Sequence, residues 1–275
     1  MFSIIITAYN HGKFIEQVKK SLDSQTFRNF EIIVIDNFST DGSAESWNTF
    51  SLKDIKTTIF LNKQNVGICK AFNQGAKMAI GKYLIDLAPD DEFREDKLQK
   101  NFELLEKTNS ELLFSDCELI DMQGKTIGLH SKLYPFDYQG KGNYFTSALE
   151  KHCIASPSMV CSKKLFNSLG GYDEQLSYED FDFICRAMHT SAIVYDKQVL
   201  VKKHMANNSL STQFKKRNSH IHYSTLKVCK KLAYLCRTEL EKKALKKRII
   251  HERNGQIKLL NLSLVIHYQQ LLYKI

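Results

Sequence analysis

The chain has few of the residues that divide a sequence into separate parts. Its 275 residues include three prolines and twelve glycines, and they contain no Gly/Ser/Pro-rich linker and no fixed-period repeat. No stretch approaches the roughly 18 to 20 apolar residues of a membrane span. The apolar run at 3–10 lacks the basic leader and the cleavage site of a signal peptide. The missing leader and membrane span favour a cytoplasmic protein. With 43% hydrophobic residues, the chain can form a full core and is expected to be globular. Its length predicts one large domain with an appendage, or two small domains.

Two phosphate-binding motifs and the cysteine patterns of metal sites are also missing. The turn after the first apolar run reads TAYNHGKF, without GxGxxG, and no Walker-type GxxxxGK[ST] occurs. A dinucleotide oxidoreductase and a P-loop enzyme are therefore disfavoured. The seven cysteines are odd in number and are never spaced as CxxC. This pattern disfavours a disulfide framework and a zinc site, so we expect free thiols.

Acidic residues are scarce only in the C-terminal part of the chain. Residues 1–201 hold 22 Lys and Arg against 27 Asp and Glu, a net charge of −5. Residues 202–275 hold 17 Lys and Arg against three Glu, a net charge of +14. The whole chain therefore carries a net charge of +9. Such asymmetry indicates that the C-terminal segment meets an anionic surface or a polyanion.

The first 121 residues alternate between strand and helix patterns. Apolar, β-branched runs predict strands at 3–7, 30–36, 56–62, 82–88 and 111–121, and helical spacing predicts helices at 12–26, 66–81 and 95–108. Gly81 is expected to be the C-cap of the second helix. Continuous apolar strands that alternate with helices predict an α/β fold with a parallel sheet covered on both faces.

The pattern is weaker after residue 121. We expect loops or short antiparallel strands at 122–150, then helices at 163–170 and within 172–188. From about residue 213 the chain is basic and helical in pattern. The predicted organisation is a main domain at 1–212 and a basic helical extension at 213–275.

Acidic and aromatic residues follow the predicted strands. Ligands of parallel sheets bind at the carboxyl ends of the strands, which is where Tyr9, Asp36 and Asp90 fall. Asp90 and Asp91 offer the hard oxygen ligands that Mg²⁺ or Mn²⁺ prefers, and a bound cation makes a diphosphate a better leaving group. The same two carboxylates are equally typical of residues that cap the helix predicted next, so both interpretations stay open.

A second acidic pair lies at the first turn of the helix predicted within SYEDFDFICRAM. A carboxylate such as Glu179 or Asp180, when it lies beside a reaction centre, can accept a proton from an acceptor hydroxyl. The alternative is that the pair only complements the positive end of the helix dipole.

Several ordered motifs in residues 1–210 resemble glycosyltransferase family 2. They are the opening SIIITAYNHGKF with its acidic turn DNFSTDGS, the segment NVGICKAFNQG, the DxD-type YLIDLAPDD, and GGYDEQLSYEDFDFICRA. The resemblance implies the GT-A fold, a Rossmann-like sheet of nucleotide-diphospho-sugar transferases, here with a basic helical C-terminal extension. It also implies an inverting enzyme, and the missing QxxRW signature favours a non-processive one.

The resemblance assigns roles residue by residue. The donor nucleotide is expected to contact Thr7, Ala8, Tyr9, Asp36, Asn65, Gly67 and Asn73. In this assignment the Tyr9 ring stacks on the base and Asp36 accepts a hydrogen bond from uracil N3–H. Asp90 and Asp91 are expected at the metal and diphosphate, and the segment 204–211 is expected to close over the donor. His204 is either a further group at the metal and diphosphate or an exposed loop histidine. Asp180 is the expected general base, with Glu179 as a neighbouring orienting group.

Two positions depart from the family pattern. Asn37 stands where the family often has a second Asp, so ribose binding is expected to differ. Ala88 replaces the first Asp of the metal motif, so Asp90 is expected to carry more of the metal contact and the metal affinity is expected to be low.

The resemblance implies a hexosyl- or N-acetylhexosaminyltransferase in cell-surface polysaccharide synthesis, with a UDP-linked donor and a glycan or lipid-linked glycan acceptor. A non-catalytic nucleotide-sugar-binding scaffold is the alternative. A pyrophosphorylase-like nucleotidyltransferase fits less well, because TAYNHGKF is not a glycine-rich basic loop. Residues 213–275 are expected to lie on an anionic membrane at the inner face of the plasma membrane, or else to pack on the main domain or dimerise. Nucleic acid binding is disfavoured, because aromatic residues are not interleaved with the basic ones.

Overall fold

The computed structural model describes residues 1–135, 144–151, 154–177, 179–205 and 210–275. These residues form two compact units, and each unit is described by itself. The first unit consists of Met1–Tyr134, Ile154–Tyr172 and Ser191–Met205, and the second of Pro135–Cys153, Asp173–Thr190 and Ala206–Ile275.

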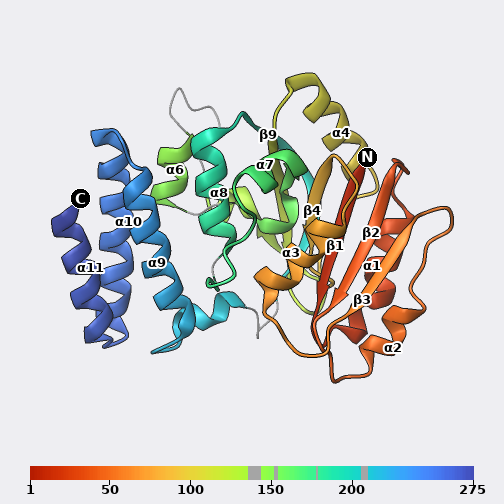
Figure 1. The fold of residues 1–275 in the computed structure, drawn as a ribbon, viewed down its shortest axis with the longest axis horizontal. Helices are drawn as coiled ribbons and strands as arrows, with labels where there is room; N and C mark the ends of the chain where they lie inside the picture. Colours follow the sequence, from red (N-terminus) through yellow and green to blue (C-terminus); the bar gives the residue numbers. More distant parts are fainter. Residues whose placement is uncertain (136–143, 152–153, 178, 206–209) are drawn as a thin grey trace. The chain divides into compact units, whose positions relative to one another are not determined.

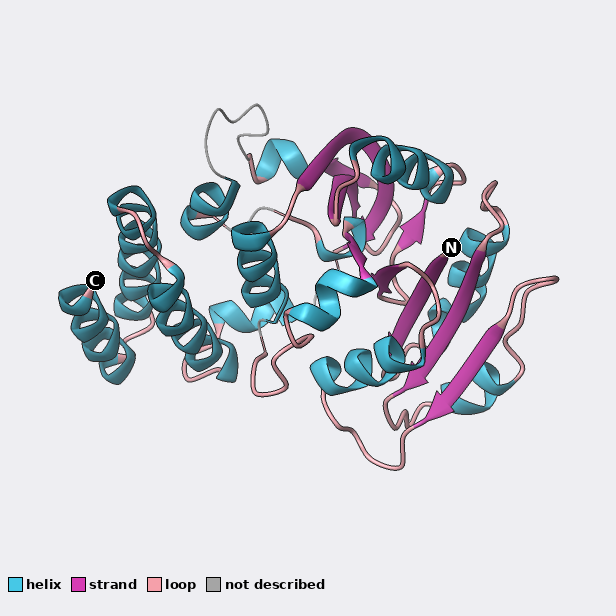
Figure 2. Cartoon of the chain, turned by 45° about the horizontal axis from the view of Figure 1, so that its top comes forward, coloured by secondary structure: helices cyan, strands magenta, loops and turns pink. Residues whose placement is uncertain are grey.

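The first unit is built on one mixed sheet (Figure 2). Its strands are β1 (Phe2–Ala8), β2 (Phe30–Asp36), β3 (Thr57–Leu61), β4 (Tyr83–Leu87), β5 (Glu92–Phe93), β6 (Leu112–Ile120), β7 (Thr126–Leu129), β8 (Val160–Ser162) and β9 (Ile193–His204). In the described residues the order is β3-β2-β1-β4-β8-β6-β9-β5, and β7 pairs with β6. β1 to β4 are parallel, as their apolar runs predict, and the short β8 is antiparallel to both of its neighbours.

Helices cover both faces of this sheet, so the predicted α/β class is confirmed. The helices of this unit are α1 (Ile15–Asp23), α2 (Ser43–Asn48), α3 (Ile68–Met78), α4 (Lys97–Thr108), α5 (His130–Leu133) and α7 (Lys163–Ser168). Alternate β1 side chains such as Ile4 share a core cluster with Val18 of α1 and Leu98 of α4. On the opposite face, Gly75 of α3 lies against Ile5 and Ile35.

The expected end of the second helix is wrong. α3 ends at Met78, and its C-cap is Ala79 rather than Gly81. Gly81 has a different role, because a Cβ atom there would lie 2.7 Å from the backbone carbon of Phe2 and the backbone nitrogen of Ser3. The residue is therefore needed for the close approach of this turn to β1.

The second unit is helical. It contains α6 (Tyr144–Glu150), α8 (Glu179–Thr190), α9 (His220–Leu235), α10 (Glu239–Lys258) and α11 (Leu262–Lys274), which Figure 1 labels. Contacts connect α6 with both α8 and α10, and α8 with α9. α8 thus packs with α6 and α9, whereas the predicted division at residue 212 grouped it with the sheet.

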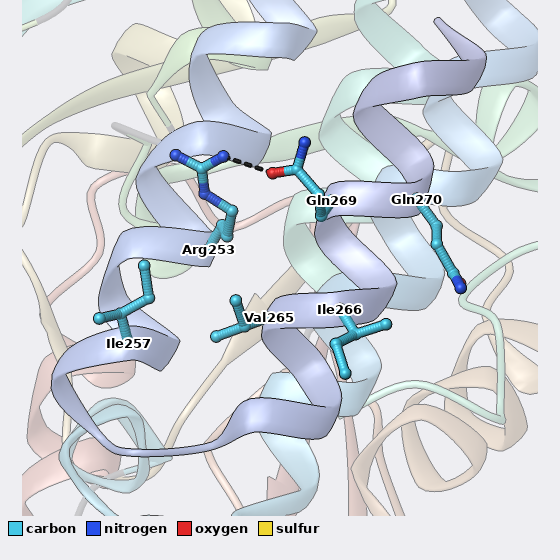
Figure 3. A pocket seen from close by; sticks show the side chains of 6 residues that line it. All are labelled: Arg253, Ile257, Val265, Ile266, Gln269 and Gln270. Carbon is cyan, nitrogen blue, oxygen red and sulfur yellow. Dashed lines mark hydrogen bonds between the residues drawn. The ribbon is translucent and has the colours of Figure 1, made fainter.

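A surface hollow of about 320 Å³ lies between α10 and α11 (Figure 3). It is lined by Arg253, Ile257, Val265, Ile266, Gln269 and Gln270. Arg253 donates a hydrogen bond of 2.6 Å to the side-chain oxygen of Gln269. Within the described part of the chain, every helix is too short or too polar to serve as a membrane span.

The cysteines are reduced wherever the structure describes them. Cys69, Cys117, Cys161, Cys185, Cys229 and Cys236 are free and buried. The prediction of free thiols is confirmed for these six residues, and Cys153 lies outside the described residues.

Candidate functional site

The carboxyl ends of β1 and β2 bring two predicted donor residues together. Ala8, the last residue of β1, pairs in register with Asp36, the last residue of β2. The backbone N–H of Asn37 donates to the carbonyl oxygen of Ala8 at 2.7 Å, which ties the two strand ends. Tyr9 follows directly, and its side chain is 44% exposed. An exposed aromatic ring beside a buried carboxylate is therefore fixed at this sheet edge.

Asp36 is held by the turn that follows it. Its side chain is buried, and its two oxygens accept hydrogen bonds from the backbone N–H of Ser39 at 2.9 Å and from the Ser39 hydroxyl at 2.6 Å. Because a carboxylate has about four acceptor positions, Asp36 retains capacity for one further donor. Phe38, between the two residues, has a left-handed backbone with φ of 71°.

Asn37, Asn65 and Gly67 form one hydrogen-bonded loop. The Asn37 amide donates to Asn65 Oδ1 at 2.9 Å, and its own oxygen accepts from the backbone N–H of Val66 at 2.9 Å. Asn65 Oδ1 also accepts the backbone N–H of Gly67 at 3.0 Å. Gly67 has a φ of 84° and is the N-cap of α3. Two predicted donor residues, Asn65 and Gly67, thus form one loop with Asn37, which has a neutral amide where the family often has an acid.

Asn73 is buried and engages the backbone of Tyr172. Its amide donates to the Tyr172 carbonyl at 2.9 Å, and its oxygen accepts the Tyr172 N–H at 3.0 Å. The Tyr172 hydroxyl in turn lies 3.4 Å from Asp86 Oδ2, and Thr7 Oγ1 lies 3.5 Å from Asp86 Oδ1. Asp86, a charged residue within the apolar run of β4, was not among the predicted residues. It links Thr7 to the Tyr172 turn that Asn73 holds.

Asp91 is a buried carboxylate and does not cap a helix. β5 follows it directly and α4 begins only at Lys97, so the capping interpretation is wrong. Asp91 Oδ1 accepts the backbone N–H of His204 at 3.1 Å, and Oδ2 lies 3.7 Å from the Lys203 ammonium. Burial raises the pKa of Asp91 to about 6, although Lys203 opposes this shift. The carboxylate therefore joins the turn after β4 to the end of β9.

Asp90 and His204 are brought together through Gln17 of α1. The Gln17 amide nitrogen lies 3.3 Å from the Asp90 carbonyl oxygen and 3.4 Å from His204 Nδ1. On the other side of the ring, His204 Nε2 lies 3.9 Å from Glu92 Oε1. Residues 206–209 of the loop expected to close over the donor lie outside the described residues.

His11 is a further polar residue near Asp90 that the sequence reasoning missed. The backbone N–H of Tyr9 donates to His11 Nδ1 at 3.1 Å, so in the neutral ring Nε2 carries the proton. Burial lowers the pKa of His11, while the charges of Asp90 and Asp41 oppose this shift. The imidazole therefore presents an N–H donor among carboxylates, and its signal in the sequence is only its place in the polar turn after the first strand.

The residues present fit a divalent cation that is held mainly by a diphosphate. Among the described side chains, no group of three carboxylates, imidazoles and thiols is arranged to hold a metal ion. One oxygen of Asp91 is buried without a hydrogen-bond partner in the same residues, and Asp90 is half-buried beside it. Mg²⁺ usually takes one or two carboxylates plus substrate phosphates rather than an all-protein cage, and this donor set can supply those carboxylates.

Glu179 and Asp180 belong to the second unit. They open α8, where Glu179 is buried and Asp180 is half-buried. Asp180 Oδ1 accepts the backbone N–H of Phe181 at 2.7 Å. The predicted donor and diphosphate residues thus all lie in the first unit, whereas the predicted base lies in the second.

Comparison with known proteins agrees with this architecture. The model of the family described as "Glycosyl transferase family 2" matches residues 3–170. An uncharacterized glycosyltransferase of Rickettsia conorii is 32% identical over 200 residues, which cover 64% of this chain and 32% of the relative. The chain thus spans about a third of that relative's length. The amylovoran biosynthesis glycosyltransferase AmsB of Erwinia amylovora is 25% identical over 227 residues, which cover 78% of this chain and 71% of AmsB.

Solved structures share the fold at low sequence identity. TarS of S. aureus, residues 1–349 in complex with UDP-GlcNAc, superposes with a TM-score of 0.73 at 17% identity, covering 94% of this chain and 72% of that one. The mannosyltransferase PcManGT of Pyrobaculum calidifontis, in complex with GDP-Man and Mn²⁺, superposes with a TM-score of 0.66 at 14% identity. The match covers 99% of this chain and 74% of that one.

Proposed function

The chain belongs to glycosyl transferase family 2, and on that premise we propose that it transfers a sugar from a nucleotide-diphosphate donor to an acceptor hydroxyl. The observation that carries the proposal is the edge of the first unit, where an exposed ring, a buried carboxylate and an acidic turn follow successive parallel strands. That edge is where ligands of such sheets bind. The name of the relative AmsB, an amylovoran biosynthesis glycosyltransferase, supports a role in cell-surface polysaccharide synthesis.

The donor we propose is UDP-linked, with a hexosyl or N-acetylhexosaminyl group. Tyr9 stacks on the base, and the unused acceptor capacity of Asp36 takes the uracil N3–H. Thr7, Ala8, Asn65, Gly67 and Asn73 shape the surrounding backbone. The TarS complex with UDP-GlcNAc is consistent with such a donor on this fold.

Asp90, with Asp91 and His204, is the proposed diphosphate end of the donor site. A bound Mg²⁺ or Mn²⁺ there would supply positive charge against the departing diphosphate. The protein itself holds Asp90 through the contact of Gln17 with its carbonyl oxygen. It holds the turn after β4 through the hydrogen bond that Asp91 accepts from the end of β9. His11 adds an N–H donor on the same side.

The reaction we propose is a single displacement with Asp180 as the general base. Asp180 takes the proton of the acceptor hydroxyl, and the oxygen forms a bond to the anomeric carbon as the bond to the diphosphate breaks. The nucleoside diphosphate leaves with the electron pair of that bond. Glu179 is the neighbouring group that orients the acceptor or the base.

Ligand-dependent melting of the full chain tests the donor site. We expect one nucleoside diphosphate, UDP, to raise the melting temperature in the presence of Mn²⁺, and we expect Asp90→Ala to lose that shift. Asp23→Ala is the matched control, because it removes an exposed carboxylate from the end of α1. No shift with any nucleotide or nucleotide sugar would favour the non-catalytic scaffold instead.

Turnover of Asp180→Asn tests the catalytic assignment. Loss of a general base lowers rates by roughly 10²- to 10⁴-fold, so we expect kcat to fall in that range while the UDP-induced melting shift stays. Glu239→Gln, an exposed carboxylate at the start of α10, is the control. An Asp180→Asn protein with full turnover would exclude Asp180 as the base.

The acceptor we propose is a glycan or lipid-linked glycan, and an anionic membrane at the inner face of the plasma membrane is the proposed partner of residues 213–275. Exposed apolar side chains lie where the chain passes from α10 to α11, among them Leu260 at 66% and Leu262 at 70%. Apolar side chains in a segment whose net charge is strongly positive favour an anionic lipid surface.

Co-sedimentation with vesicles tests the membrane proposal. We expect binding to vesicles that contain phosphatidylserine and weak binding to neutral ones. The double change Leu260→Ser and Leu262→Ser is expected to reduce binding, whereas Ile80→Ser, at a 62% exposed apolar residue of the first unit, leaves it unchanged. Equal binding of all three proteins would contradict the assigned surface.

A further inference from the structure

A single ammonium group of α9 lies between two carboxylates that bracket the start of α8. Lys231 Nζ donates to Asp173 Oδ2 at 2.8 Å and lies 2.8 Å from Asp182 Oδ1. Asp173 belongs to the loop before α8, and Asp182 is the fourth residue of that helix. The two ends of the segment 173–182 are thus joined through one side chain of the C-terminal extension.

The second oxygen of Asp182 is also paired. Arg186, one turn later on α8, places Nε at 2.8 Å and Nη2 at 2.7 Å from Asp182 Oδ2. The Asp182 side chain is fully buried, whereas the Lys231 side chain is 38% exposed. A buried carboxylate needs such partners, and removal of one leaves an uncompensated charge.

The shared ammonium also affects the loop carboxylate. Burial raises the pKa of Asp173, but the hydrogen bonds from Lys231 and from the backbone N–H of Gln175, with the charges of Lys231 and Arg186, together lower it. The contact with Lys231 therefore contributes to the charged form of Asp173.

Two further contacts hold the same segment from the C-terminal helices. The backbone N–H of Ser177 donates to the Ser224 hydroxyl on α9 at 2.8 Å. The Arg248 guanidinium of α10 stacks on the Phe181 ring at 4.3 Å from its centroid. Both contacted residues lie within three positions of Asp180, so the first turn of α8 is fixed from α9 and α10.

We propose that Lys231 is a positioning residue for the general base Asp180. By binding Asp173 and Asp182 together, it fixes the segment that carries Asp180 two residues before Asp182. This inference rests on the proposed function, and it gives the basic extension a positioning role in the reaction that is separate from any contact with lipid.

Steady-state kinetics of Lys231→Met in the full chain tests the proposal. We expect kcat to fall at least tenfold, with the donor KM and the UDP-induced melting shift within twofold of wild type. Lys231→Arg is expected to recover part of kcat, because its several donors can reach both carboxylates. Lys230→Met is the matched control, since it removes the same charge from an exposed neighbour on α9.

The assay temperature separates positioning from stability. Each variant is assayed well below its melting temperature, where circular dichroism shows it folded. A contact that only adds stability would lower the melting temperature and leave kcat unchanged, and that result would overturn the proposal. Absence of transfer by the wild-type protein would instead contradict the proposed function itself.

A second variant covers the case in which Lys231→Met does not fold. Adding Asp182→Asn replaces the buried carboxylate that has lost the Lys231 ammonium by a neutral amide, whose oxygen can still accept from Arg186, and it is expected to restore the folded state. The double variant is expected to keep the low kcat. Wild-type turnover by the folded double variant would overturn the assignment.

Discussion

Lys97 is a fully buried ammonium group in the first unit, and it makes the stability of that unit depend on pH. Its Nζ donates to Asn101 Oδ1 at 2.9 Å and lies 4.9 Å from the centroid of the Phe93 ring. Burial lowers its pKa from 10.5 to about 8, although the charges of Cys117 and Asp196 oppose this. Between these two pH values the unfolded chain binds more protons than the folded one, so the free energy of unfolding rises with pH.

We therefore expect the stability of the wild type to rise relative to Lys97→Met as the pH is raised from 7 to 10. The relative gain is at most about 3 kcal/mol, from 1.36 kcal/mol per pKa unit. Urea unfolding of both proteins at several pH values measures it. Lys100→Met, at a partly exposed residue of the same helix, should show no such trend, and a constant difference between wild type and Lys97→Met would refute the prediction.

Some residues of the candidate site could be predicted from the sequence, and the contacts of others could not. The positions of Tyr9, Asp36 and Asp90 follow from the strand runs, because residues after parallel strands share one edge. The partners of Asn73 and Asp86 could not be predicted, because each depends on a contact between segments distant in sequence. Asn73, for example, pairs with Tyr172, 99 residues away.

At the scale of elements, the five longer apolar strands were predicted, whereas the short apolar β8 and the polar β9 were not. Strand β2 occupies the predicted residues, and β1, β3, β4 and β6 lie within one residue of prediction at each end. β9 was missed, because its sequence IVYDKQVLVKKH carries four charged residues and does not form an apolar run. It is specified by its pairing with β6, a contact between distant segments.

The turn between α3 and β4 supplies a test at the same scale. We expect Gly81→Ala to destabilise the first unit by about 1–3 kcal/mol or more, because the new Cβ would lie 2.7 Å from the β1 backbone. Gly255→Ala is the matched change, since nothing lies within 4 Å of its Cβ and alanine favours a helix by about 1 kcal/mol. Thermal melting distinguishes the two, and equal melting temperatures would contradict the close approach.

For the whole molecule, the arrangement of the units predicts how a shortened chain behaves. A chain that ends at residue 212 lacks α9, which contacts α8, and α10, which contacts α6, together with α11, which packs on both α9 and α10. The buried residues of α8 would then lose the Lys231 and Arg248 contacts that cover its first turn. We expect α8 to be unfolded in this chain, although the division at residue 212 predicts that it folds.

Thiol labelling decides between these outcomes, because each unit holds a buried free cysteine. Cys185 lies on α8, and Cys161 lies on β8 of the first unit. In the full chain both are expected to resist a thiol reagent. In the chain 1–212, Cys185 is expected to react at a rate close to that in urea while Cys161 stays protected. If Cys185 is protected as well, residues 1–212 fold as one domain. If both cysteines react, the sheet itself needs the C-terminal helices, and the independence of the first unit that this prediction assumes is wrong.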